Sequence, residues 1–182
     1  MAKSKLAVAA ATLALAGVLA LAGCASQQGS GGQQGGSAPT ADSAAAQSGA
    51  SKATYITPTP QDGAIAINVA DLTTTPTFVN YDANGTTVQL IAGIASDGSA
   101  RVALNTCQVC NPSPKAYFAQ NGSKLVCQNC GNKFTMDDVG DAALGCNPTQ
   151  VDHAESNGVI TVATSALDAE VKAFAKWQGP TA

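Results

Sequence analysis

Hydrophobic and polar residues alternate over several short stretches of the chain, which predicts a mainly β domain. Ile65, Ile67 and Val69 are separated by small or polar residues, the period of a half-buried strand. Asn84-Gly85 lies between two apolar stretches and predicts a hairpin turn, and Asp97-Gly98 predicts a second turn. Strands are therefore expected over residues 64–69, 78–81, 86–91, 100–104 and 158–162.

The last part of the chain has a different spacing of apolar residues. Leu167, Val171 and Phe174 fall on one face of a helix over residues 165–178. Ser165 and Asp168 have the spacing of a capping box, and Gly179-Pro180 ends the pattern. The expected fold is a small β sandwich or barrel with one short C-terminal helix that covers a sheet.

The first 23 residues have the features of an export signal. Lys3 and Lys5 precede an apolar run over residues 6–21, which is short for a membrane-spanning helix. The run ends in Leu21-Ala22-Gly23-Cys24, which resembles the lipobox of bacterial lipoproteins. The resemblance implies that Cys24 is lipidated and anchors the protein on the extracytoplasmic side of a cell membrane.

Residues 24–53 are predicted to be a tether, and residues 54–182 the folded domain. Residues 25–53 consist almost entirely of Ala, Gly, Ser and Gln, without aromatic or branched aliphatic side chains, a composition that does not form a packed core. Loss of the two signal lysines changes the net charge from −3 to −5. An acidic domain of this kind is a poor partner for nucleic acid.

Five of the six cysteines lie in one 40-residue window. Cys107 and Cys110 form one Cys-x2-Cys pair, and Cys127 and Cys130 form a second pair sixteen residues further on. One tight turn can present two sulfurs to a metal, and two such turns complete a tetrahedral thiolate site. Four thiolates gather stably only around a cation or a cluster, so the spacing predicts that these four cysteines are metal ligands.

Two metal-free alternatives remain open at this point. The pairs could form disulfides outside the cytosol, although a bridge within a Cys-x2-Cys pair closes a very small loop. A thioredoxin-type dithiol normally opens a helix, and Asn111-Pro112 after Cys110 does not favour one. Cys146 is a fifth thiol with four possible roles. It is an additional ligand, a neighbour that tunes the centre, a capture point for metal or a small buried residue, and the sequence leaves all four open.

The cysteine segments resemble the FtrD-like family of membrane-associated iron–sulfur proteins. The likeness rests on Thr106–Cys110, Lys124–Phe134 and Gly145–Pro148, and it extends over about residues 57–162. The sequence departs from the family pattern at Leu144-Gly145 and Ala116-Tyr117, outside the four predicted ligands. The resemblance implies an iron–sulfur centre and a role in bacterial iron uptake, with a redox protein or an iron permease as partner.

The order of the two cysteine loops and the later proline loop is also similar to that of Rieske domains. Cys110 and Cys130 stand where Rieske loops have histidines, so this likeness implies an all-thiolate [2Fe–2S] centre of lower potential. Zinc ribbons share the Cys-x2-Cys-Gly turn, so a Rieske-like and a zinc-ribbon-like domain are both expected folds.

Lys3-Ser4-Lys5 is not the twin-arginine signal of proteins exported with a cluster in place. A single iron or zinc ion is therefore the alternative cofactor.

Little else in the sequence points to chemistry. His153 is the only histidine, and it is expected to be solvated, as are the acidic residues Asp137, Asp138 and Asp141. No nucleophile elbow or phosphate loop is present. The expected function is an electron carrier or iron-handling lipoprotein rather than an enzyme, with a zinc-stapled binding module or a thiol–disulfide redox protein as alternatives.

Overall fold

Strands make up most of the regular structure, and the mainly β prediction is confirmed. The computed structural model describes residues 52–140 and 145–182. The predicted signal, Cys24 and most of the predicted tether lie outside the described residues. The strands are β1 (Thr54–Ile56), β2 (Ala64–Asn68), β3 (Thr77–Ala83), β4 (Thr86–Ile94), β5 (Ala100–Cys107), β6 (Phe118–Asn121), β7 (Lys124–Cys127), β8 (Lys133–Phe134), β9 (Pro148–Gln150), β10 (Ala154–Ser156) and β11 (Val159–Ala163).

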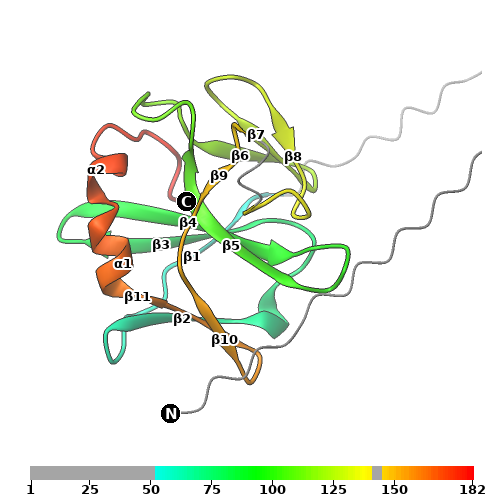
Figure 1. Cartoon of the computed structure of the whole chain (residues 1–182), viewed down its shortest axis with the longest axis vertical. Helices are drawn as coiled ribbons and strands as arrows, with labels where there is room; N and C mark the ends of the chain where they lie inside the picture. The colour runs from blue at the N-terminus through cyan, green and yellow to red at the C-terminus, as the bar shows by residue number, and fades with distance from the viewer. Residues whose placement is uncertain (1–51, 141–144) are drawn as a thin grey trace, which may run out of the picture. The chain divides into compact units, whose positions relative to one another are not determined.

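The described strands form three sheets. The central sheet has the order β1-β3-β4-β5-β9, with β1 parallel to β3 and the other neighbours antiparallel. The second sheet has the order β10-β11-β2 and the third the order β6-β7-β8. Figure 1 shows the second sheet below the central strands and the third sheet above them.

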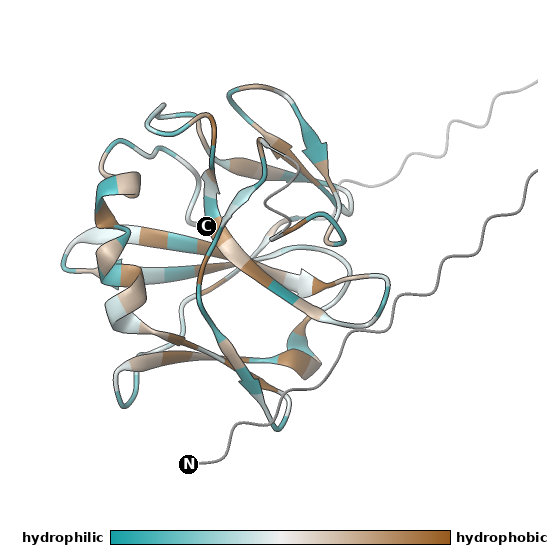
Figure 2. Ribbon diagram, viewed as in Figure 1, coloured by the Kyte–Doolittle hydropathy of each residue, from teal (hydrophilic) through white to brown (hydrophobic). Residues whose placement is uncertain are grey.

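The central sheet is buried on both faces, which explains why β4 and β5 read as nearly continuous apolar runs. Val88, Leu90 and Leu104 belong to a core shared with β2, β11 and the C-terminal helices. Ile91 and Ala103 alternate with them and belong to a second core shared with β6, β7 and β8. Figure 2 shows hydrophobic residues along these strands and hydrophilic ones in the turns between them. The third sheet is therefore fixed to the central one by apolar packing.

The predicted C-terminal helix is present but shorter, and it is divided in two. α1 spans Thr164–Ala169, α2 spans Val171–Phe174, and a 3-10 helix, η1, spans Val69–Asp71. The predicted Ser165 cap is wrong: the N-cap residue is Ala163, with no side-chain cap. Asp168 instead accepts a hydrogen bond of 2.9 Å from the Tyr81 hydroxyl, so its carboxylate holds the helix to β3.

Two buried amides join the central sheet to the third sheet. Asn105 Nδ2 donates to Gln89 Oε1 at 2.7 Å and to the Phe118 carbonyl at 3.2 Å. Asn105 Oδ1 accepts from the Phe118 amide at 2.7 Å. Both amide side chains have no exposed surface. Gln89 Nε2 also donates to the Pro180 carbonyl at 2.9 Å, so the same network reaches the C-terminal segment.

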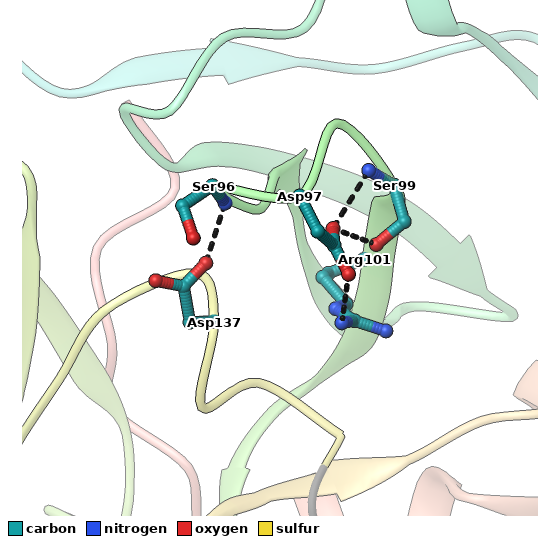
Figure 3. Close-up of polar contacts among 5 residues, drawn as sticks. All are labelled: Ser96, Asp97, Ser99, Arg101 and Asp137. Carbon is teal, nitrogen blue, oxygen red and sulfur yellow. Dashed lines mark hydrogen bonds and ion pairs between the residues drawn. The ribbon is translucent and has the colours of Figure 1, made fainter.

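Acidic side chains hold the turn between β4 and β5 and attach the loop after β8 to it. Asp97 accepts bonds from the Ser99 amide and hydroxyl and forms an ion pair of 3.3 Å with Arg101. Asp137 accepts from the Ser96 amide, as Figure 3 shows. Asp138 accepts from the Thr135 amide and hydroxyl. Asp137 and Asp138 thus have structural partners beyond the solvent, and Asp141 lies outside the described residues.

Candidate metal centre

The two Cys-x2-Cys pairs occupy equivalent positions in the fold. Cys107 is the last residue of β5 and Cys127 is the last residue of β7. In each case the chain turns at once, and the fourth amide after the cysteine donates to its carbonyl, at 3.0 Å from Asn111 and 2.9 Å from Gly131. Gly131 has a φ of +77°, a conformation that glycine adopts without strain. Strand ends followed by tight turns therefore present both pairs.

Polar contacts hold the two cysteine loops together. The Ser113 hydroxyl donates to Asn129 Oδ1 at 2.7 Å, which joins the first loop to the second. Asn111 Nδ2 donates to Thr106 Oγ1 at 2.8 Å and to the Ala173 carbonyl at 2.7 Å. The first loop is thus anchored to its own strand, to the second loop and to α2.

β9 brings the fifth cysteine to the same place. It pairs with the end of β5, with Pro148 opposite Cys107, so Cys146 lies beside the first loop. The Gln108 amide donates to the Asn147 carbonyl at 3.1 Å. The fully buried Asn147 side chain accepts from the Gly140 amide and donates to the Asp138 carbonyl. These bonds fix the segment that carries Cys146.

The sulfur atoms converge, as the spacing predicts. The Sγ atoms of Cys107, Cys110, Cys130 and Cys146 all lie within 4.8 Å of one another. Cys127 is outside that group, but its Sγ lies 3.9 Å from Cys110 Sγ. The five described cysteines are free thiols, and 3.9 Å is far longer than a disulfide bond of about 2.05 Å. The predicted ligand set of Cys107, Cys110, Cys127 and Cys130 stays a prediction, and the geometry adds Cys146 to the candidates.

Burial differs strongly among the five thiols. Cys107 and Cys127 are buried in the second core, Cys110 and Cys146 are half-buried, and Cys130 is exposed. Burial is the main reason why the pKa of the Cys107 and Cys127 thiols is raised. In both cases backbone amides of the same turn hydrogen bond to the sulfur and partly offset this effect. The centre thus has a dry inner side and one solvent-facing thiol.

The pKa of the Cys130 thiol is lowered, so this thiol ionises more readily than an ordinary cysteine. Burial raises its pKa, but the Asn132 amide and the neighbouring thiols of Cys127, Cys110 and Cys146 outweigh this effect, and the net pKa is lowered. Four or five thiols with amide donors at their sulfurs are the ligands that zinc, iron and iron–sulfur clusters prefer. The residues present therefore fit a thiophilic metal centre.

The family model described as "Membrane iron-sulfur containing protein FtrD-like" matches residues 73–174, which is more than half of the chain. The chain belongs to the FtrD-like family. This confirms the predicted family, and its name indicates a membrane-associated iron–sulfur protein. No curated protein and no solved structure matches the chain. The likeness to Rieske domains and zinc ribbons stays a prediction.

The FtrD-like match covers β3 to α2, and hence both cysteine loops and Cys146. Within the described residues, no helix is both long and apolar enough to cross a membrane.

His153 is exposed and its Nδ1 lies 3.0 Å from the Val151 carbonyl oxygen. It lines a pocket of about 640 Å³ with Arg101 and Asp152, and it is not part of the thiol group.

Sequence reasoning did not identify the asparagines that support the centre. Asn105 interrupts an apolar strand, Asn111 follows Cys110 and Asn147 follows Cys146. A polar residue at a buried position normally has hydrogen-bond partners. The structure shows that Asn105 and Asn147 are fully buried. The position of Asn105 inside an apolar stretch was the signal in the sequence, but the sequence does not show which groups either side chain contacts.

Proposed function

We propose that this FtrD-like protein is a lipid-anchored carrier that holds iron on its cysteine thiolates and exchanges electrons or iron with an uptake partner. The observation that carries the proposal is the convergence of thiols from two strand-end loops and the Cys146 segment. The family name supports iron–sulfur chemistry. The bound iron would supply a one-electron redox couple, and the [2Fe–2S] form predicted from sequence stays a prediction.

The exposure of one side of the centre supports exchange with a partner protein. Cys130 is exposed, so a partner can approach one sulfur without opening the domain. Val109, in the first loop, is a large hydrophobic side chain with 65% exposure. Gln108, Gln128 and Asn129 around these residues are exposed and uncharged. This surface can contact a partner without displacing strongly hydrated charges.

Iron content and spectroscopy test the proposal. The full chain, purified anaerobically in detergent, should contain iron and should absorb visible light through thiolate-to-iron charge transfer. It should also show an EPR signal in one of its two redox states. A colourless protein with one zinc per chain would contradict the proposal and favour a zinc-stapled binding module. A metal-free protein with Cys107–Cys110 or cross-pair disulfides in non-reduced peptides would favour a thiol–disulfide protein.

The lipid anchor is tested separately at Cys24. Cys24→Ala should move the protein out of the membrane fraction or leave its signal uncleaved, because the acyl chains that hold it to the bilayer cannot be attached. The measurement is fractionation with mass spectrometry of the N-terminal peptide. Ser26→Ala is the matched control and should stay in the membrane fraction. Unchanged membrane association of Cys24→Ala, with a cleaved signal, would disprove the anchor.

A further inference from the structure

We infer that the centre is built for one tetrahedral ion held by Cys107, Cys110, Cys130 and Cys146, with Cys127 as an additional thiol beside it. The inference rests on the proposed function, which it makes more specific in two ways. The centre holds one metal ion, and Cys146 takes the place of Cys127 among the four ligands expected from the Cys-x2-Cys spacing.

The distances between the sulfur atoms support a single ion. Metal–sulfur bonds of about 2.3 Å in a tetrahedron place the sulfurs about 3.8 Å apart. All six pairs among Cys107, Cys110, Cys130 and Cys146 are within 4.8 Å, so small adjustments of the side chains close the shell. Four thiols this close together can all reach one central atom.

The same distances do not suit a two-iron cluster. Each iron of such a cluster takes two thiolates, so thiolates on different irons are separated by the iron–iron distance as well as by the metal–sulfur bonds. This places them roughly 5–6 Å apart or more. No pair among these four sulfurs is that far apart. A [2Fe–2S] cluster would require the two loops to move away from each other.

The support around Cys146 argues that it belongs to the ligand set. Its carbonyl oxygen lies 3.5 Å from Cys107 Sγ. The next residue, Asn147, is fully buried and is bonded through its side chain to the loop after β8 and through its carbonyl to Gln108 of the first cysteine loop. The backbone thus places this thiol beside the other sulfurs. Such outer contacts commonly fix metal ligands in position.

Cys127 occupies a different position from the other four. Its sulfur contacts Cys110 at 3.9 Å and interacts with Cys130, but it is not within 4.8 Å of all four. Its side chain is buried in the second core, beside Phe118 and Leu125. A buried thiol next to two ligands completes the packing of the centre without being needed to close the tetrahedron.

Cobalt(II) titration of the metal-free full chain in detergent tests both parts of the inference. One equivalent should saturate the site and give the charge-transfer absorbance of four thiolates. Cys146→Ser should lose about a quarter of that absorbance, one thiolate in four, and bind cobalt at least about tenfold more weakly. Cys127→Ser is the matched control and should keep the full absorbance. If Cys127→Ser does not fold, Cys127→Ala keeps the site apolar and takes its place.

The outcomes separate this inference from the proposed function. One iron per chain without acid-labile sulfide supports both. Two irons with matching sulfide overturn the inference and leave the proposed function intact. One cobalt site in a protein that carries no iron from the cell contradicts the proposed function and still supports the inference. Loss of a thiolate in Cys127→Ser but not in Cys146→Ser overturns the ligand assignment.

Discussion

Cys107→Ser is expected to weaken cobalt or iron binding by at least about 100-fold, because it replaces a soft thiolate ligand with a hydroxyl. Cys107 belongs both to the ligand set predicted from sequence and to the group of sulfurs within 4.8 Å. Its side chain has no exposed surface, so water cannot easily take its place. The measurement is competitive titration of the metal-free protein, with circular dichroism to verify folding.

Ala103→Ser is the control for the Cys107 variant. Ala103 lies on the same strand, β5, and is also fully buried. The substitution therefore introduces a buried hydroxyl at a position that is not a thiol. It should leave the metal affinity within about twofold while costing a similar amount of stability. Equal metal affinity of Cys107→Ser and Ala103→Ser would show that Cys107 is not a ligand.

Asn105→Ala is expected to lower the free energy of unfolding by about 3–5 kcal/mol, because it leaves several buried polar groups without their partner. These groups are Gln89 Oε1 and the backbone amide and carbonyl of Phe118. Phe118 begins β6, which pairs with the cysteine-bearing strand β7. Urea denaturation monitored by Trp177 fluorescence measures the change.

Asn68→Ala is the matched control for Asn105. Asn68 is exposed and donates only a 3.3 Å bond to Asp71, so its loss should change stability by no more than about 0.5 kcal/mol. A change below about 1 kcal/mol in Asn105→Ala would mean that the amide network does not hold the third sheet to the central one.

The central hairpins could be predicted from sequence because their signals are local. The alternation of Ile65 and Ile67 and the turns at Asn84-Gly85 and Asp97-Gly98 each act within a few residues, and the corresponding strands β2 to β5 are all present. β1 could not be predicted in the same way. It has three residues, and its parallel partner β3 begins about twenty residues further along the chain.

The candidate site was predictable in its type but not in its membership. The Cys-x2-Cys spacing indicates a thiolate centre because two sulfurs of one turn point to one place. The place of Cys146 depends on β9 pairing with β5 about forty residues away, with an irregular register between Leu104 and Cys107. The three residues of β9 carry no local signal that shows with which strand they pair.

The helix prediction failed at its start for a tertiary reason. Ser165 and Asp168 have the spacing of a capping box, but the Tyr81 hydroxyl on β3 bonds to the Asp168 carboxylate. Thr164 bonds through its amide and hydroxyl to the Gly63 carbonyl and starts the helix one residue early. Contacts with residues distant in the sequence therefore override the local signal.

The two cysteine loops differ at one backbone position. In the second loop the Asn132 amide hydrogen bonds to the Cys130 sulfur, whereas Pro112 occupies the equivalent place after Cys110 and has no N–H to donate. Pro112 thus leaves Cys110 without the backbone donor that stabilises negative charge on Cys130. The backbone dipole that supports a thiolate is therefore placed on the solvent-facing Cys130 edge of the centre, and the half-buried Cys110 edge lacks it.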